Sequence, residues 1–165
     1  MKRVVIIAFS LVAVGLLAAW LATRPSAIEK EVRAQTWTLV RLASGGEEVV
    51  LPDDASITLE PMGGRRFVGD AGVNSYEVHL AINRDGEISF TGGGGGVTEM
   101  AGPPHLMAAE AAYLAAFWQI ETAQVSGSML VLKGPGVQLD YEGKPAPPLD
   151  NSGSPDDTVS NSAEE

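Results

Sequence analysis

The sequence contains no cysteine among its 165 residues. It can therefore form no disulfide, no thiolate metal site and no cysteine nucleophile, and a lipid-modified cysteine cannot anchor it. Basic residues and histidines are also scarce, at 11 and 2 against 21 acidic residues. Because an acidic surface repels phosphate backbones, we expect no nucleic-acid partner. We also expect no cofactor and no metal centre.

The negative charge is concentrated in the middle of the chain. Residues 36–142 carry 14 acidic and 5 basic side chains, whereas residues 1–35 carry 2 and 5. The stretch 36–142 is long enough for one domain with one hydrophobic core. We interpret its acidity as a means of keeping that domain soluble.

An apolar run occupies Val4 to Ala22, with Ser10 as its only polar residue. As a helix it would be about 28 Å long, close to the hydrocarbon thickness of a bilayer. We expect a transmembrane anchor, with residues 1–3 in the cytoplasm and the domain on the periplasmic or extracellular side. A cleaved signal peptide, which would make the protein secreted, is the alternative. The run is longer than usual for one and lacks a clear small-x-small cleavage site.

The segments on either side of the domain are polar. Residues 23–35 have alternating charges and are predicted to be a linker. Residues 143–165 contain four prolines, no aromatic residue and many Ser, Asp and Asn, so we predict a disordered acidic tail. Asp156 and Asp157 could attract a divalent cation, but a flexible carboxylate pair is a poor cage.

Within the domain, apolar and polar residues alternate as in β-strands over 36–43, 55–61 and 65–72. Residues 74–92 predict a hairpin that turns at Asp85 and Gly86. A helix is expected from Pro103 and Pro104 to about Glu121, and two more strands over 124–142. The predicted fold is α+β, a curled antiparallel sheet or small β-barrel with one capping α-helix, plus the N-terminal transmembrane helix.

The stretch GDAGVNSY predicts a tight corner between two strands. Gly69 and Gly72 allow positive φ or a close approach of the backbone, and the Asn74 side chain can bind corner amides.

These residues resemble the G-x-x-G-C-N-x-Y motif of the META domain family of HslJ-like heat-shock proteins. TEMAG, residues 98–102, resembles the T-x-M-A-C motif of the same family. The matching residues, in chain order, are Trp37, Gly69, Gly72, Asn74, Tyr76, Thr98, Met100, Ala101 and Glu110. The resemblance covers residues 36–142 and implies a cell-envelope protein associated with stress tolerance or secretion.

The chain departs from the family pattern at three positions. Val73 and Gly102 stand where relatives commonly have cysteine, so any bridge or thiol of those relatives is lost. Glu99 stands where the family often has arginine, which reverses a charge.

Four residues from the two motifs form the candidate ligand or partner pocket: Asn74, Tyr76, Thr98 and Met100. In one interpretation they line the rim of the curled sheet, where a lipophilic molecule or a protein segment could bind. In the other, Asn74 and Thr98 bind loop backbone while Tyr76 and Met100 pack in the core beneath the helix.

Two other features carry weaker functional hypotheses. The glycine run Gly92 to Gly96 is not followed by lysine and serine or threonine, so a phosphate loop is excluded and a flexible loop is expected. His79 shares a strand face with Glu77, and His105 precedes the helix, but no nucleophile accompanies either imidazole.

The favoured function is therefore a membrane-anchored, non-enzymatic binding module for a protein or lipophilic ligand. The alternatives are a small hydrolase with His79 or His105 as its base, and a structural spacer.

Overall fold

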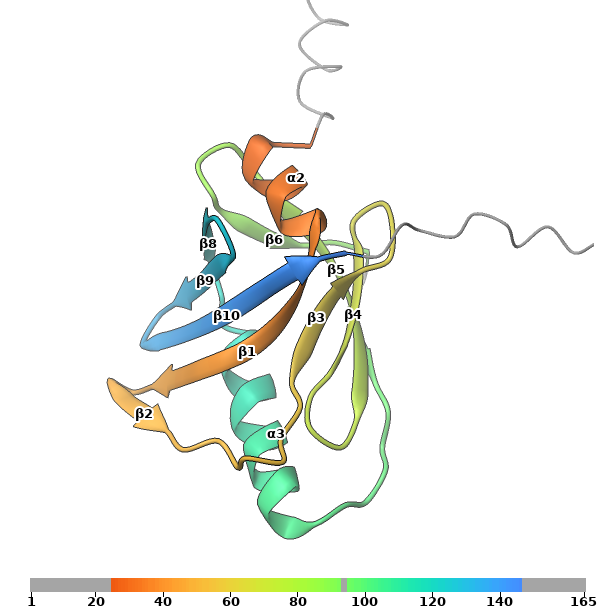
Figure 1. Ribbon diagram of the computed structural model, residues 1–165, viewed down its shortest axis with the longest axis vertical. Helices are drawn as coiled ribbons and strands as arrows, with labels where there is room; N and C mark the ends of the chain where they lie inside the picture. Colours follow the sequence, from red (N-terminus) through yellow and green to blue (C-terminus); the bar gives the residue numbers. More distant parts are fainter. Residues whose placement is uncertain (1–24, 93–94, 147–165) are drawn as a thin grey trace, which may run out of the picture.

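A computed structural model describes residues 25–92 and 95–146. They form a ten-stranded, mostly antiparallel sheet that curls into a nearly closed barrel, with two helices (Figure 1). The helices are α2 (Ala27–Arg33) and α3 (Pro104–Phe117), and the strands are β1 (Gln35–Ser44), β2 (Glu47–Val49), β3 (Thr58–Pro61), β4 (Arg66–Asp70), β5 (Ser75–Ile82), β6 (Ile88–Phe90), β7 (Gly96–Val97), β8 (Thr122–Ser126), β9 (Met129–Gly134) and β10 (Val137–Pro145).

The strand order is β6-β5-β4-β3-β1-β10-β9-β8, with β2 beside β1 and β7 beside β5. Backbone bonds also join the two ends of this order. The amide of Ile88 donates to Glu121 O at 2.7 Å, and that of Ala123 donates to Gly86 O at 2.7 Å. The sheet is therefore nearly closed, which limits its exposed edges. The predicted hairpin with its turn at Asp85 and Gly86 is confirmed as β5 and β6.

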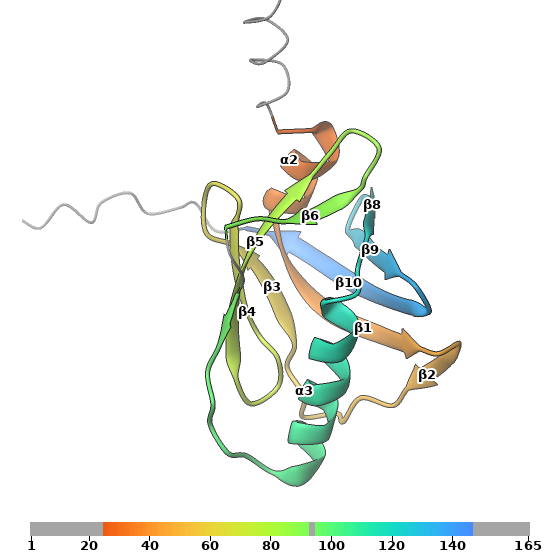
Figure 2. The same cartoon turned by 180° about the vertical axis from the view of Figure 1, so that it is seen from behind.

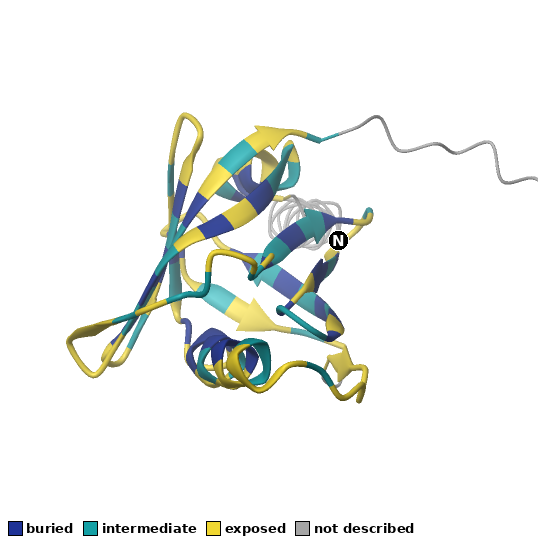
Figure 3. Ribbon diagram, turned by 60° about the horizontal axis from the view of Figure 1, so that its bottom comes forward, coloured by how far each residue is buried: buried dark blue, intermediate teal, exposed yellow. Residues whose placement is uncertain are grey.

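Alternation along the strands places apolar side chains inside the curled sheet. In β5, Tyr76, Val78, Leu80 and Ile82 are each at most 3% exposed, while the residues between them are not buried. Figure 3 shows the same banding along the other strands. The largest buried side chain is that of Trp37, in the first strand.

The segment predicted to be a linker contains helix α2, which corrects the prediction of a single capping helix. Ser26 caps the helix by accepting a hydrogen bond from the Glu29 amide at 2.9 Å. Val32 is 1% exposed, and its carbonyl accepts a hydrogen bond from the Trp37 indole at 2.7 Å. The two helices lie at opposite ends of the curled sheet (Figures 1 and 2).

Helix α3 begins at Pro104, as the proline pair predicts, but ends at Phe117 rather than at Glu121. Ala109, Tyr113 and Phe117 are buried as the helical spacing predicts. By the helical period Trp118, four residues after Leu114, would widen this apolar stripe, yet it caps the end of the helix and is 40% exposed.

The C-terminal region differs from the prediction in two respects. Residues 122–145 form three strands rather than two, because a second tight turn at Gly127 separates β8 from β9. Residues 143–145 belong to β10 rather than to the tail. A side chain on Gly143 would collide with the Trp37 ring at 2.5 Å, so glycine is needed there for the two strands to pair.

The predicted anchor, Val4 to Ala22, and the tail residues 147–165, including Asp156 and Asp157, lie outside the described residues. Of the residues that are described, none belongs to a helix long and apolar enough to cross a membrane.

Candidate functional site

The predicted corner between β4 and β5 depends on both of its glycines. Gly72 has φ = 123°, a conformation that residues with a side chain rarely adopt. Gly69 lies so close to the carbonyl of Thr58 on β3 that a side chain would collide with it. The glycines therefore allow the sharp turn and the close approach of β3 to β4.

The Glu110 carboxylate of α3 joins this corner to the helix. Its Oε2 accepts hydrogen bonds from the amides of Val73 at 3.0 Å and Asn74 at 2.6 Å. Its Oε1 accepts a third, from Nδ2 of Asn74, at 2.8 Å. Both side chains are nearly inaccessible, with Asn74 2% and Glu110 6% exposed. Burial raises the pKa of the Glu110 carboxyl, but these hydrogen bonds outweigh burial and lower its pKa below the ordinary value.

The same Asn74 side chain joins the segment that precedes α3. Its Oδ1 accepts hydrogen bonds from the Thr98 hydroxyl at 2.9 Å and the Met100 amide at 2.6 Å. Its Nδ2 also donates to Met100 O at 3.1 Å. We call Asn74, Thr98 and Glu110, with the backbone of Val73 and Met100, the corner latch. It brings together three segments that are far apart in the sequence.

Tyr76 lies inside the curled sheet in a chain of three tyrosines. Its hydroxyl donates to Thr58 O at 2.7 Å, so the contact of 2.7 Å with the Tyr113 hydroxyl must be donated by Tyr113. Tyr141 in turn donates to Tyr113 at 3.1 Å. Burial raises the pKa of all three hydroxyls, so they remain protonated donors at neutral pH.

The structure therefore brings Asn74, Thr98 and Met100 together, but as a latch rather than as the lining of one cavity. Asn74 and Thr98 bind backbone groups, and Tyr76 packs in the core, as the second interpretation predicts. The Met100 side chain is 56% exposed, so the prediction that it packs beneath the helix is wrong. Only its backbone takes part in the latch.

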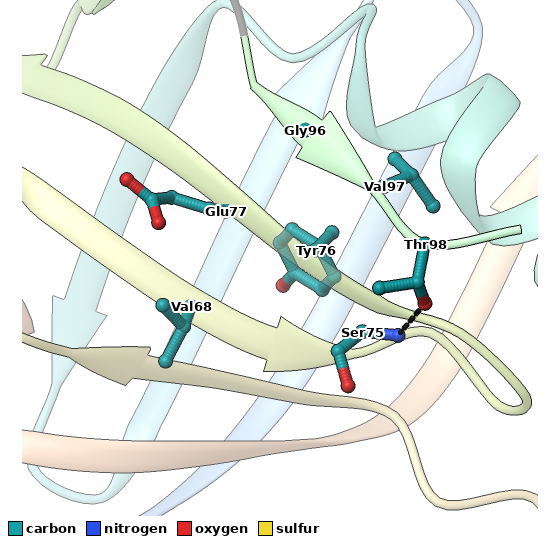
Figure 4. Close-up of a pocket in the computed structure, with 7 residues that line it drawn as sticks. All are labelled: Val68, Ser75, Tyr76, Glu77, Gly96, Val97 and Thr98. Carbon is teal, nitrogen blue, oxygen red and sulfur yellow. Dashed lines mark hydrogen bonds between the residues drawn. The ribbon is translucent and has the colours of Figure 1, made fainter.

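A hollow of about 370 Å³ lies on the outer face of the sheet, over β4, β5 and β7. Figure 4 shows its lining side chains, which come from three neighbouring strands. We call it the outer groove, and its residues are Val68, Ser75, Tyr76, Glu77, Gly96, Val97 and Thr98. Two of the predicted pocket residues, Tyr76 and Thr98, line it, whereas Asn74 and Met100 do not.

Exposed aromatic side chains lie beside the outer groove. A side chain on Gly95 would meet the Trp118 ring at 2.9 Å, so Trp118 lies against the residue next to Gly96 of the groove. The rings of Trp118 and Phe90 are 5.3 Å apart, and they are 40% and 38% exposed. Only the helical stripe of the sequence pointed to Trp118, and it placed the ring in the core.

The glycine run forms the connection between β6 and β7, and its residues 93 and 94 lie outside the described ones. Gly95 leaves no room for a side chain, because the Glu77 carbonyl and the Trp118 ring occupy that space. Glycine at this position therefore lets the connection lie flat on β5. A phosphate-binding role has no support from these contacts.

The two histidines lie in separate exposed places. His79 Nε2 is 3.4 Å from Glu77 Oε1, which confirms that they share a strand face, and Glu77 also binds Arg66 at 2.7 Å. The Arg66 hydrogen bond is the main cause that lowers the pKa of Glu77. His105 lies 3.1 Å from Asp54 and lowers the pKa of that carboxyl.

No described serine, threonine or tyrosine hydroxyl bonds either imidazole ring. Within residues 25–92 and 95–146, no group of three or more histidine, aspartate or glutamate side chains could hold a metal ion.

Comparison with known proteins gives one family match. The family model of the META domain matches residues 30–145, which include every described strand and α3. Among curated proteins none matches. An NMR structure of a protein from Burkholderia xenovorans is 25% identical, with a TM-score of 0.58, over 73% of this chain and 90% of that one. A second NMR structure is 15% identical, with a TM-score of 0.48, over 68% and 92%.

Proposed function

Because this chain belongs to the META domain family, we propose that it is a membrane-tethered binding module that holds a protein partner in its outer groove. It performs no chemistry of its own in this proposal. The segment Val4 to Ala22 is the tether, and the domain stands on the periplasmic or extracellular side. A role in stress tolerance or secretion follows from the family resemblance, and it belongs to the proposal.

The single observation that carries the proposal is the position of the outer groove. It lies on the outside of the sheet, and six of its seven residues are exposed or half-exposed: Val68, Ser75, Glu77, Gly96, Val97 and Thr98. A small ligand usually needs a pocket that covers most of its surface. A shallow groove with apolar side chains suits a segment of another protein better.

The exposed rings of Trp118 and Phe90 support the same surface. Exposed apolar patches on soluble domains mark interaction sites, and tryptophan is among the residues that contribute most to binding. Although the domain is acidic, the charge at this patch is partly neutralised, which reduces the repulsion of an acidic partner. The nearest carboxylate in the groove, Glu77, is already paired with Arg66.

Site-specific photo-crosslinking in cells tests this proposal. A photoreactive residue in place of Val97 should give an adduct with one defined protein. The matched control is Val40, which is 51% exposed on β1, outside the groove. The same residue there should give no such adduct, and Trp118→Ala should reduce the adduct at position 97.

The mass of the adduct distinguishes the alternatives. A lipid adduct at position 97 would favour the lipophilic ligand instead of a protein. Equal adducts at positions 97 and 40, or none at either, would contradict the proposal and favour the structural spacer. The hydrolase alternative has no comparable geometric support, since neither imidazole contacts a nucleophile among the described residues.

A further inference from the structure

A second hollow, of about 280 Å³, lies at the end of the domain where α2 begins. Its lining comes from two segments, the start of the described chain with α2 and the turn between β3 and β4. We call it the arginine cradle, and its residues are Pro25, Glu29, Arg33, Gly64 and Arg65. Its volume is below the range typical of pockets for drug-sized ligands, so it suits a small group.

Arg33 enters the cradle with incomplete hydrogen bonding. Its Nε is buried and has no hydrogen-bond partner in the described part of the chain. Its one ion pair within residues 25–92 and 95–146 is with Glu29, whose Oε1 lies 4.0 Å from Nη1. An unpaired buried N–H costs about 1–3 kcal/mol and needs an explanation. The Arg33 guanidinium is partly exposed and can rotate towards the hollow. A hydrogen-bond acceptor bound there would then pair with Nε.

Arg65 reaches the cradle from a turn that only glycine can form easily. Gly63 and Gly64 have φ values of 88° and 56°. Within residues 25–92 and 95–146, no carboxylate forms an ion pair with Arg65, although its neighbour Arg66 is paired with Glu77. One carboxylate and two guanidinium groups leave the cradle with a net positive charge inside an acidic domain.

We propose that the arginine cradle binds the phosphate of an anionic lipid headgroup. This inference rests on the membrane tether proposed above. Guanidinium groups bind phosphate oxygens through paired, charge-assisted hydrogen bonds. Only two residues, Thr23 and Arg24, lie between Ala22, the end of the predicted anchor, and Pro25 at the cradle, which makes three Cα–Cα steps. A chain of that length spans at most about 11 Å, so the cradle lies at or just above the headgroup layer.

The surroundings of the cradle suit the same surface. The β3–β4 and β5–β6 turns flank α2 at the end of the domain where the described chain begins (Figures 1 and 2). Lys30 and Arg84 lie on α2 and in the β5–β6 turn, and Glu31 and Asp85 on the same two segments balance their charge, so the positive charge at this end is that of the cradle itself. A basic residue close to an anionic leaflet contributes attraction, whereas the acidic remainder of the domain is repelled.

The test uses the full chain in maltoside micelles, which contain no phosphate, and follows the NMR signals of the arginine Nε–Hε groups. Titration with phosphatidylglycerol should shift the signals of Arg33 and Arg65 saturably. Arg65→Gln should weaken this response at least about ten-fold, and Arg65→Lys, which keeps the charge, should weaken it less. Lys133→Gln, a control on β9, should leave it unchanged.

The other outcomes each count against the inference. An equal, saturable response to inorganic phosphate would assign the cradle to free phosphate and overturn the lipid. No saturable shift while the chain diffuses with the micelle would overturn the cradle and leave the tether intact. If the chain does not enter micelles at all, the tether itself fails, and the inference fails with it.

Discussion

At the residue scale, the residues that match the family motifs stabilise the fold. Asn74 belongs to the corner motif and Glu110 to the other residues that match the family, and the sequence could show that Asn74 suits a corner. It could not show that Glu110 accepts three hydrogen bonds there, because the two residues are 36 positions apart. The contact exists only once α3 packs beside the corner.

Glu110→Gln tests the corner latch. The substitution keeps the size of the side chain but removes the charge and places the NH2 of a carboxamide against either the two backbone amides or Nδ2 of Asn74. We expect the free energy of unfolding to fall by about 2–3 kcal/mol, because buried donors lose a charged acceptor. Glu99→Gln, an exposed control, should change it little. A loss no larger for Glu110→Gln than for the control, in urea unfolding of the full chain in micelles, would contradict the assignment.

Because the pKa of Glu110 is lowered in the folded protein, the free energy of unfolding depends on pH. A carboxyl whose pKa is lower in the folded state stabilises the protein above its unfolded-state pKa. That stability is lost as the pH falls from the ordinary carboxyl pKa through the lowered one. The native chain should therefore lose more stability across this acid range than Glu110→Gln does. If the native chain and Glu110→Gln lost the same stability across this acid range, the assignment of a lowered pKa to Glu110 would be wrong.

Tyr76→Phe tests the direction of the tyrosine chain. It leaves Thr58 O without its donor and the Tyr113 hydroxyl without its acceptor, so we expect a loss of about 1–3 kcal/mol. Tyr141→Phe is the matched comparison, since Tyr141 only donates to Tyr113, which keeps its bond to Tyr76. Its loss should be smaller. Thermal unfolding that ranks the two variants in the opposite order would refute this direction.

At the element scale, the strands and α3 can be predicted from patterns in the sequence. Period-two alternation predicts β5, and the proline pair predicts where α3 begins. Helix α2 could not be found in this way, because it has seven residues and mostly charged side chains. Its stability depends on tertiary contacts, above all the burial of Val32 and the Trp37 indole bond. The outer groove was missed for a similar reason, because it exists only when β4, β5 and β7 lie side by side.

The corner and the segment before α3 lie close enough for a covalent link. A Cβ on Gly102 would be 3.3 Å from the Cβ of Val73, slightly below the usual range for disulfides. We expect the double variant Val73→Cys, Gly102→Cys to form this bond under oxidising conditions. It should gain about 3 kcal/mol over its reduced form, since it closes a long loop. Unfolding with and without reductant measures the gain, and Val73→Cys alone should show none.

At the scale of the whole molecule, charge and apolar surface are unevenly distributed. The domain is acidic, the apolar run is N-terminal, and the arginine cradle lies at the end where that run enters. The sequence could show the first two features, since they are matters of composition. It could not show the third, because Arg33 and Arg65 meet only when α2 packs beside the β3–β4 turn.

The proposed tether predicts how the full chain behaves in a membrane fraction. It should remain with the membranes after an alkaline carbonate wash, because a helix of 19 residues of which only Ser10 is polar is not released by weakening electrostatic contacts. Replacing Leu11 and Val14 with arginine should release the chain. Recovery of the native chain in the wash, or of a chain that has lost its first residues, would favour the signal-peptide alternative.

Hydrogen exchange of the full chain in micelles, resolved for each amide by NMR, tests the central claim most directly. The claim is that residues distant in the sequence form one hydrogen-bonded latch around the buried side chains of Asn74 and Glu110, and that the outer groove is open in the free protein. The amides of Val73, Asn74 and Met100 lie outside the strands, yet they should exchange as slowly as those in the middle of β5, whereas the amide of Gly95 beside the groove should exchange quickly. Rapid exchange at Val73, Asn74 and Met100, at rates typical of exposed loops, would contradict the account.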